Sequence, residues 1–204
     1  MLGRLQNEDA RDRTIRAIQG RYNVDQSQAA RVEESALMLL RAVRKDWGLK
    51  GAEPRRYLAW AAQMHEVGLD IAHAKYHKHG GYLIANAYLP GFVSFDQLIL
   101  SMLVAHHRRK IEGLDTNKLP ESWQKKLPRL LVLFRLAVLL NRSRSSADLP
   151  ELNMRAKGDK LGIDFPVDWL DNNRLTKADL EQEIEWLQPT GVRLLVASVD
   201  EGQA

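Results

Sequence analysis

The chain has 204 residues, of which 45% are hydrophobic and 27% charged, with no cysteine and a formal net charge of +4. The absence of cysteine excludes disulfides and thiolate-bound metals, and no apolar run is long enough to span a bilayer. The composition favours a globular, cytoplasmic protein with one domain or two small ones.

Positive charge is concentrated in one part of the chain. Residues 104–146 contain ten Lys or Arg and three acidic residues, whereas residues 147–204 contain six Lys or Arg and twelve acidic residues. A concentrated basic segment suits a polyanion such as polyphosphate, nucleic acid or an anionic lipid surface. The same charges can also serve only to solvate the outer faces of helices, and the sequence leaves both interpretations open.

Helices are predicted for most of the first 145 residues, because apolar residues recur there at intervals of three and four. Asp25, followed three residues later by Gln28, predicts an N-terminal cap. The segment 130–140 is apolar nearly all round, so its helix should lie at the centre of a bundle. The predicted helices span residues 10–21, 26–47, 54–67, 78–87, 94–109 and 123–143.

The pattern changes near Pro150, where a small α+β domain is predicted to begin after a linker at residues 144–150. Alternation of apolar and polar residues predicts strands, and Thr176 followed by Asp179 predicts the start of a helix. The predicted elements are strands over 152–156, 161–165 and 192–199, and a helix over 176–187. The fold class is therefore mainly α, a helical bundle followed by a strand-strand-helix-strand unit.

All six histidines lie between His65 and Lys110. They fall in the motifs His-Glu-Val-Gly, His-Lys-His-Gly-Gly and His-His-Arg-Arg-Lys, with one histidine between the first two motifs. Histidine binds metals and phosphates and exchanges protons near neutral pH. Chemistry or anion binding is therefore expected first in this part of the chain.

These motifs also carry a family resemblance. In order along the chain, DARDRTIRAIQGRYNVDQSQAARV, HEVGLDI, YHKHGGYLIANAYLPGF, LVAHHRRK, LFRLAVLLNRSR and LTKADLEQEIEWL resemble the C-terminal half of the exopolyphosphatase and guanosine pentaphosphate phosphohydrolase family. The resemblance covers nearly the whole chain. It implies an HD-like helical bundle in residues 1–145 followed by a small α+β domain in residues 150–204. It also implies that polyphosphate or pppGpp is hydrolysed, with Mg²⁺ or Mn²⁺, by N-terminal actin-like domains that nothing in this sequence resembles.

A metal site of the HD type is the first hypothesis for the histidines. Such a site gathers an early His, a His-Asp pair and a late Asp around a divalent ion. Aligned by motif, these positions hold Gln28, His65-Glu66 and Val138. Val138 cannot bind a metal and Gln28 would bind weakly. No metal site is therefore expected, and if one exists its ligands should be His65, Glu66 and His106.

Phosphate binding without catalysis is the second hypothesis, and it assigns no catalytic residue to this chain. The planar fork of arginine contacts phosphate oxygens at two points, and histidine or lysine can add further contacts. The resemblance implies the same role, because the C-terminal domains of that family help to hold long polyphosphate. The candidate phosphate-binding residues are His77, His79, His106, His107, Arg108, Arg109, Lys110, Lys125, Lys126, Arg129, Arg142 and Arg144.

A structural role is the third hypothesis. His65 lies on the apolar face of its predicted helix and suits a hydrogen-bonded core position. His106 and His107 are adjacent, so on a helix they point about 100° apart and cannot easily face one ligand. Arg135 lies inside the apolar segment and needs a partner if it is buried. Glu66 is predicted to be that partner.

The leading interpretation is a polyphosphate-binding, dimerising C-terminal module of an exopolyphosphatase-like enzyme, inactive without its catalytic domains. Its expected partners are polyphosphate or pppGpp, the actin-like catalytic domains and a second copy of the chain. One alternative is a divergent HD-type metal-dependent phosphohydrolase that acts alone. Another is a module that binds nucleic acid or a signalling nucleotide.

Overall fold

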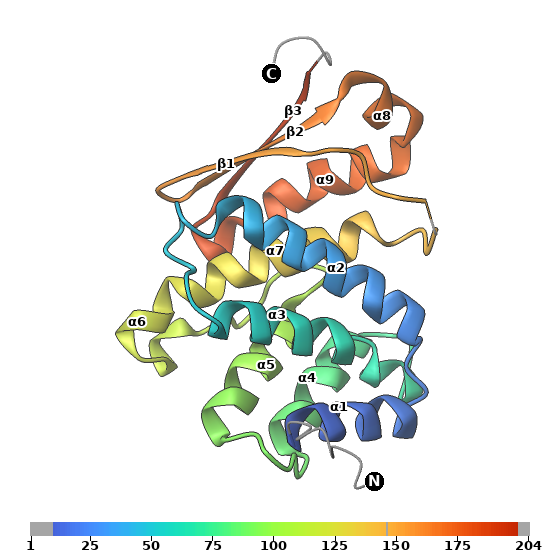
Figure 1. The fold of residues 1–204 in the computed structure, drawn as a ribbon, viewed down its shortest axis with the longest axis vertical. Helices are drawn as coiled ribbons and strands as arrows, with labels where there is room; N and C mark the ends of the chain where they lie inside the picture. Colours follow the sequence, from blue (N-terminus) through green and yellow to red (C-terminus); the bar gives the residue numbers. More distant parts are fainter. Residues whose placement is uncertain (1–9, 146, 200–204) are drawn as a thin grey trace, which may run out of the picture.

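The computed structural model describes residues 10–145 and 147–199 (Figure 1). Its first part is a bundle of helices, and its second part is a small sheet with two helices. The fold class predicted from the sequence, mainly α with a small α+β part near the C-terminus, is therefore confirmed. The domain boundary between residues 145 and 150 stays a prediction, because buried apolar residues of both parts join in one continuous core.

Seven α-helices form the first part. Asp25 caps the second helix by accepting a hydrogen bond from the backbone N–H of Gln28 at 2.9 Å, as predicted. Two 3₁₀ turns, Val67–Asp70 and Thr116–Lys118, connect some of the helices. The helices are α1 (Ala10–Arg21), α2 (Gln26–Val43), α3 (Glu53–Met64), α4 (Tyr76–Asn86), α5 (Ser94–His106), α6 (Glu121–Gln124) and α7 (Lys126–Leu140).

Helix α7 lies at the centre of this bundle, as its apolar sequence predicted. All of its residues from Leu130 to Ala137 are buried, and it packs against α2, α3 and α5. The single long helix predicted over 123–143 is wrong, because the chain forms α6 and α7 instead. Pro128 explains the break. It has no N–H to continue a preceding helix, but it fits the first turn of a new one.

The second part is a three-stranded sheet covered by α8 (Val167–Asn172) and α9 (Arg174–Trp186). The strands β1 (Asn153–Lys157), β2 (Lys160–Pro166) and β3 (Arg193–Val199) lie in the order β1-β2-β3. Strands β1 and β2 form an antiparallel hairpin, and β3 runs parallel to β2. Helix α8 was not predicted. Helix α9 contacts both α7 and β3, so it lies between the sheet and the bundle (Figure 1).

The β1–β2 hairpin is also tied to the bundle by hydrogen bonds. The indole N–H of Trp47 donates to the carbonyl oxygen of Gly158 at 3.0 Å. The guanidinium of Arg129 donates to the carbonyl oxygens of Trp47 at 3.0 Å and Gly158 at 3.3 Å. The turn predicted at Gly158 therefore closes the β1–β2 hairpin and also attaches it to the helical bundle.

Candidate functional site

A cleft of about 620 Å³ lies where the bundle meets α9. Five arginines and three carboxylates line it, together with aromatic and apolar side chains. One wall comes from the segments around the ends of α3, α5 and α7, and the other from α9. The lining residues are Gln28, His65, Glu66, Leu69, His73, Tyr76, His107, Arg108, Arg109, Arg135, Val138, Leu139, Arg142, Arg144, Ala178, Asp179, Gln182, Glu183 and Trp186.

The four positions aligned with HD metal ligands all line this cleft, although they are far apart in the sequence. Gln28 is held by its neighbours, since its amide donates to the carbonyl oxygen of Asn141 at 2.8 Å. Glu66 accepts a hydrogen bond from the guanidinium of Arg144, which also pairs with Asp25 at 2.9 Å. A guanidinium therefore contacts one carboxylate oxygen of Glu66, while the other oxygen is buried without a hydrogen-bond partner among the described residues.

These positions do not fit a divalent ion. Val138 has no donor atom, the amide oxygen of Gln28 accepts a hydrogen bond from Arg31 at 2.8 Å, and Glu66 is paired with a cation. Within residues 10–145 and 147–199, no three His, Asp, Glu or Cys side chains are grouped to hold a metal ion. His106, the third ligand in the metal hypothesis, faces backbone carbonyls instead: its ring nitrogens lie 2.8 Å from Met102 O and 3.1 Å from Glu112 O.

The predicted pairing of Arg135 with Glu66 is wrong. Arg135 is 1% exposed, as expected for a buried position, but its partner is Glu183 on α9. Its Nε and Nη2 atoms donate to the two carboxylate oxygens of Glu183, the latter at 2.8 Å. The partner of Glu66 is Arg144, which follows α7. The sequence correctly indicated that Arg135 and Glu66 are charges that need partners. It could not show that each of them pairs with a different residue and not with the other.

Arg108 and Arg109 form the least neutralised part of the cleft. Neither side chain has an ion-pair partner among the described residues, whereas Arg142 pairs with Asp179 and Arg144 with Asp25 and Glu66. Arg108 lies over the ring of Tyr76, 4.6 Å from its centroid, which fixes the guanidinium at the cleft. An arginine side chain that has no acidic partner within the protein is available to bind an anion.

Backbone strain accompanies the cleft. Arg109 has φ 62° and Arg144 has φ 55°, and both line the cleft. Lys75, at the start of α4 beside Tyr76, has φ 56°. Residues with a side chain are disfavoured in this left-handed region, and such strain persists where the surrounding structure holds it in place, often at functional sites. Of these three residues, Arg109 and Arg144 belong to the cleft lining, and Lys75 does not.

His65 and His107, two of the three histidines that line the cleft, are buried and uncharged near neutral pH. His107 is 1% exposed, its Nδ1 lies 2.7 Å from Val104 O, and burial holds the pKa of its imidazole well below the usual value. His65 has its Nδ1 2.6 Å from Ala62 O, and burial lowers its pKa as well. The two rings meet edge to face at 5.5 Å. The core position predicted for His65 is confirmed, and His107 can offer a phosphate no charge.

The remaining histidines on the candidate list lie outside the cleft lining. His77 is buried, its Nδ1 has no hydrogen-bond partner among the described residues, and burial lowers its pKa to about 4. His106 is held by carbonyl groups at the end of α5. His79 is half-buried on α4. The two glycines that follow His79 let α4 approach α5, because a Cβ on Gly81 would lie 2.5 Å from the Cβ of Ala105. This motif therefore has a packing role.

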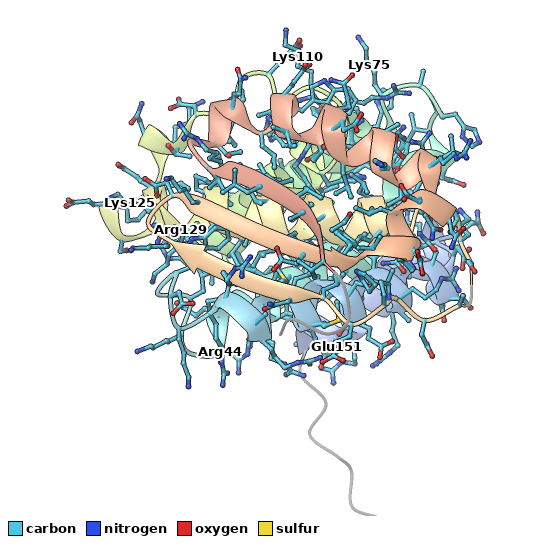
Figure 2. The ribbon with its side chains drawn as sticks, turned by 90° about the horizontal axis from the view of Figure 1, so that it is seen from above. Arg44, Lys75, Lys110, Lys125, Arg129 and Glu151 are labelled. Atoms are coloured by element: carbon cyan, nitrogen blue, oxygen red, sulfur yellow. The ribbon has the colours of Figure 1, made fainter. Side chains whose placement is uncertain are left out.

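The other basic candidates also lie outside the cleft lining. Lys110 and Lys125 are exposed, and Figure 2 shows both at the outer edge of the molecule. Lys126 lies over the ring of Trp123, 5.4 Å from its centroid. Arg129 is used by the hairpin and pairs with Asp159 at 3.1 Å. Of the twelve candidates, the structure brings five to the cleft, namely His107, Arg108, Arg109, Arg142 and Arg144.

Sequence reasoning missed the contribution of α9. Asp179, Gln182 and Trp186 line the cleft, and Glu183 completes the pair with Arg135. These residues belong to the acidic C-terminal part, in which the sequence analysis named no candidate site residue. His73 was also missed, because it stands outside the three histidine motifs. The spacing of Asp179, Gln182, Glu183 and Trp186 along one helix face is the only local signal that they act together.

The fold and the cleft define a mainly helical protein with an arginine-lined cleft between the bundle and α9. Residues 10–184 match the model of the Ppx/GppA phosphatase family, domain III. The chain belongs to the Ppx/GppA phosphatase family, which confirms the resemblance seen in the sequence. No helix in the described part is both long and apolar enough to cross a lipid bilayer.

Curated relatives agree with this membership. The chain is 34% identical over 201 residues to a guanosine-5'-triphosphate,3'-diphosphate pyrophosphatase of Pseudoalteromonas translucida, covering 96% of this chain and 39% of that protein. Proteins of the same name from Vibrio vulnificus and Aeromonas hydrophila are 34% and 32% identical, each over 97% of this chain. The chain spans about two-fifths of the length of these relatives.

Proposed function

We propose that this chain is the substrate-holding part of a Ppx/GppA-type phosphatase, and that its cleft binds the phosphate chain of polyphosphate or pppGpp. The observation that carries the proposal is the pair Arg108 and Arg109, which line a cleft without any acidic partner among the described residues. Arginine is suited to this role because its planar fork makes two hydrogen bonds to phosphate oxygens. The names of the relatives, which contain a phosphate-dense guanosine nucleotide, support the ligand class.

Hydrolysis is assigned, from the family resemblance, to the N-terminal actin-like domains of the whole enzyme, with Mg²⁺ or Mn²⁺ bound there. The cleft supports this assignment, since its positions aligned with HD metal ligands do not suit a divalent ion and its three carboxylates are each paired with an arginine. In the whole enzyme the cleft would hold the phosphate chain in place by electrostatic attraction and hydrogen bonds. A second copy of the chain is proposed as a further partner on the basis of the family resemblance.

Titration with polyphosphate of defined length tests the proposal. The chain should bind polyphosphate without releasing phosphate from it, with or without added Mg²⁺ or Mn²⁺. Binding should be competed by pppGpp more strongly than by RNA of equal charge, because aromatic side chains do not interleave with the basic segment as in single-strand binders. Stronger binding of RNA would favour a nucleic-acid module, and phosphate release by the isolated chain would favour a stand-alone phosphohydrolase. Sedimentation of the same samples checks for a dimer.

A further inference from the structure

Arg135 makes four hydrogen bonds from one buried guanidinium. Nε and Nη2 contact the two carboxylate oxygens of Glu183. Nη1 donates to the carbonyl oxygen of His106, and Nη2 also donates to that of Arg109 at 2.8 Å. A buried charge that is paired and hydrogen-bonded on every side holds its neighbours in one arrangement.

The two carbonyl groups that Arg135 contacts flank the point where Arg108 and Arg109 leave α5. The last carbonyl groups of a helix have no partner within the helix, so they need donors from elsewhere. Arg135 supplies those donors on both sides of a turn in which Arg109 has the left-handed φ of 62°. The direction in which Arg108 and Arg109 enter the cleft therefore depends on a residue in the middle of α7.

Glu183 links the same guanidinium to the opposite wall. It is 4% exposed and lies on α9, the helix whose residues Asp179, Gln182 and Trp186 line the cleft. Burial raises the pKa of Glu183, while the hydrogen bonds from Arg135 act in the opposite direction. One ion pair thus connects the α5 wall of the cleft to the α9 wall through the central helix.

We infer that Arg135 and Glu183 are positioning residues for the phosphate cleft: their pair fixes the turn that presents Arg108 and Arg109 and sets its distance from α9. This inference rests on the proposed function, since it assumes that phosphates bind to those arginines. It goes beyond stability. A buried ion pair can often be replaced by apolar side chains at little cost in stability, so the geometric role of this pair can be tested separately from its effect on stability.

The double variant Arg135→Met/Glu183→Leu tests the inference, because it removes one positive and one negative charge and leaves the net charge of the cleft unchanged. Its thermal unfolding midpoint should fall only moderately, because apolar side chains replace the ion pair while the carbonyl groups of His106 and Arg109 lose a donor. Its affinity for polyphosphate, measured well below that midpoint, should fall about tenfold because the turn is no longer held. The matched control Arg129→Met/Asp159→Asn removes an ion pair outside the cleft and should bind as the unaltered chain does.

For the single variant Glu183→Gln, an account based on charge alone and the positioning account predict opposite changes in polyphosphate affinity. This variant also tests the inference if the double variant does not fold. If charge alone governs binding, loss of an acidic residue from the cleft should tighten polyphosphate binding. The positioning role predicts weaker binding instead. Tighter or unchanged binding by Glu183→Gln, or unaltered affinity in a folded double variant, would overturn the inference.

Failure of the proposed function would appear differently. If Arg108→Ala/Arg109→Ala binds polyphosphate as tightly as the unaltered chain, the cleft is not the phosphate site and both proposals fall. If that variant binds weakly but the Arg135 and Glu183 variants bind normally, the cleft remains the site and only the positioning role is lost.

Discussion

Two basic segments lie close together in the sequence, Arg108–Lys110 after α5 and Lys125–Arg129 at the start of α7. Their composition is similar, yet the structure uses them differently. Arg108 and Arg109 line the cleft without acidic partners, whereas Arg129 is bonded to the β1–β2 hairpin and Lys125 extends from the outer surface. Enclosure by α9 and a left-handed turn at Arg109, rather than the number of charges, distinguish the first segment as a candidate site.

The largest expected effect is the loss of affinity in Arg108→Ala/Arg109→Ala. Each arginine should lose a charge-assisted hydrogen bond to phosphate worth about 1.5 kcal/mol, so polyphosphate affinity should fall roughly 100-fold. Isothermal titration at fixed salt measures this. A thermal unfolding control is needed because Arg108 also lies over Tyr76, a contact worth about 0.5–1 kcal/mol. If the folded variant loses less than threefold in polyphosphate affinity, Arg108–Lys110 is no more a binding segment than Lys125–Arg129.

The next largest effect is a pH dependence of stability that comes from the buried, neutral histidines near the first segment. The second segment, Lys125–Arg129, has no such histidines. Burial lowers the pKa of His65, His106 and His107, and it lowers that of His77 to about 4. Unfolded histidine takes up a proton near pH 6.5, so below that pH the unfolded state binds more protons than the folded state. Their contribution to stability is therefore present above about pH 6.5 and is lost as pH falls through the folded pKa values.

Urea unfolding at pH 7, 6 and 5 should show this loss as a decrease of about 2 kcal/mol in the free energy of unfolding. The variant His107→Gln carries no titrating group at that position. It should be less stable at pH 7 but should show a shallower dependence on pH. An equal slope in both proteins would mean that His107 is not held neutral in the folded state.

A smaller effect on stability, with none on binding, is expected for Arg129→Met. The side chain donates to two backbone carbonyl oxygens and to Asp159, and its replacement leaves those carbonyls without a donor. Loss of these contacts should lower the free energy of unfolding by about 1.5 kcal/mol. The control Asp159→Asn removes only the exposed ion pair and should cost about 0.5 kcal/mol or less. A large loss of polyphosphate affinity in Arg129→Met would show that this segment also binds the ligand.

The smallest effect is predicted for Lys125→Ala/Lys126→Ala. Lys125 is exposed on the outer surface, and Lys126 is held over Trp123. Only long-range attraction should be lost, so polyphosphate affinity should change by about twofold or less at physiological salt. A tenfold loss would mean that the ligand crosses the outer surface of α6 and α7 as well as the cleft.

Periodicity was enough to predict most helices and all three strands, because these elements repeat a buried face along the chain. The errors occur where distant groups decide the local structure. The helix predicted to end at Arg109 stops at His106, where Arg135 takes the carbonyl groups of His106 and Arg109. Helix α8 is only six residues long, too short for a periodic pattern to identify.

The candidate site was harder to predict than the fold. Residue type selected Arg108, Arg109, Arg142 and Arg144, which line the cleft, but it also selected histidines that are buried against backbone carbonyls. Arg135 was recognised as a buried cation, yet its partner Glu183 lies 48 residues away on another helix, and no local pattern links the two residues. Burial and pairing across the chain determine which of several similar side chains face a ligand.

The salt dependence of polyphosphate binding tests the central claim most directly. Each arginine that contacts a phosphate releases counterions, so the slope of log affinity against log salt should become shallower by about 1 to 2 in Arg108→Ala/Arg109→Ala. The slope should stay nearly unchanged in Lys125→Ala/Lys126→Ala, which removes the same number of positive charges. Equal slopes for the two variants would contradict the account, because polyphosphate would then respond to the overall positive charge and not to the cleft.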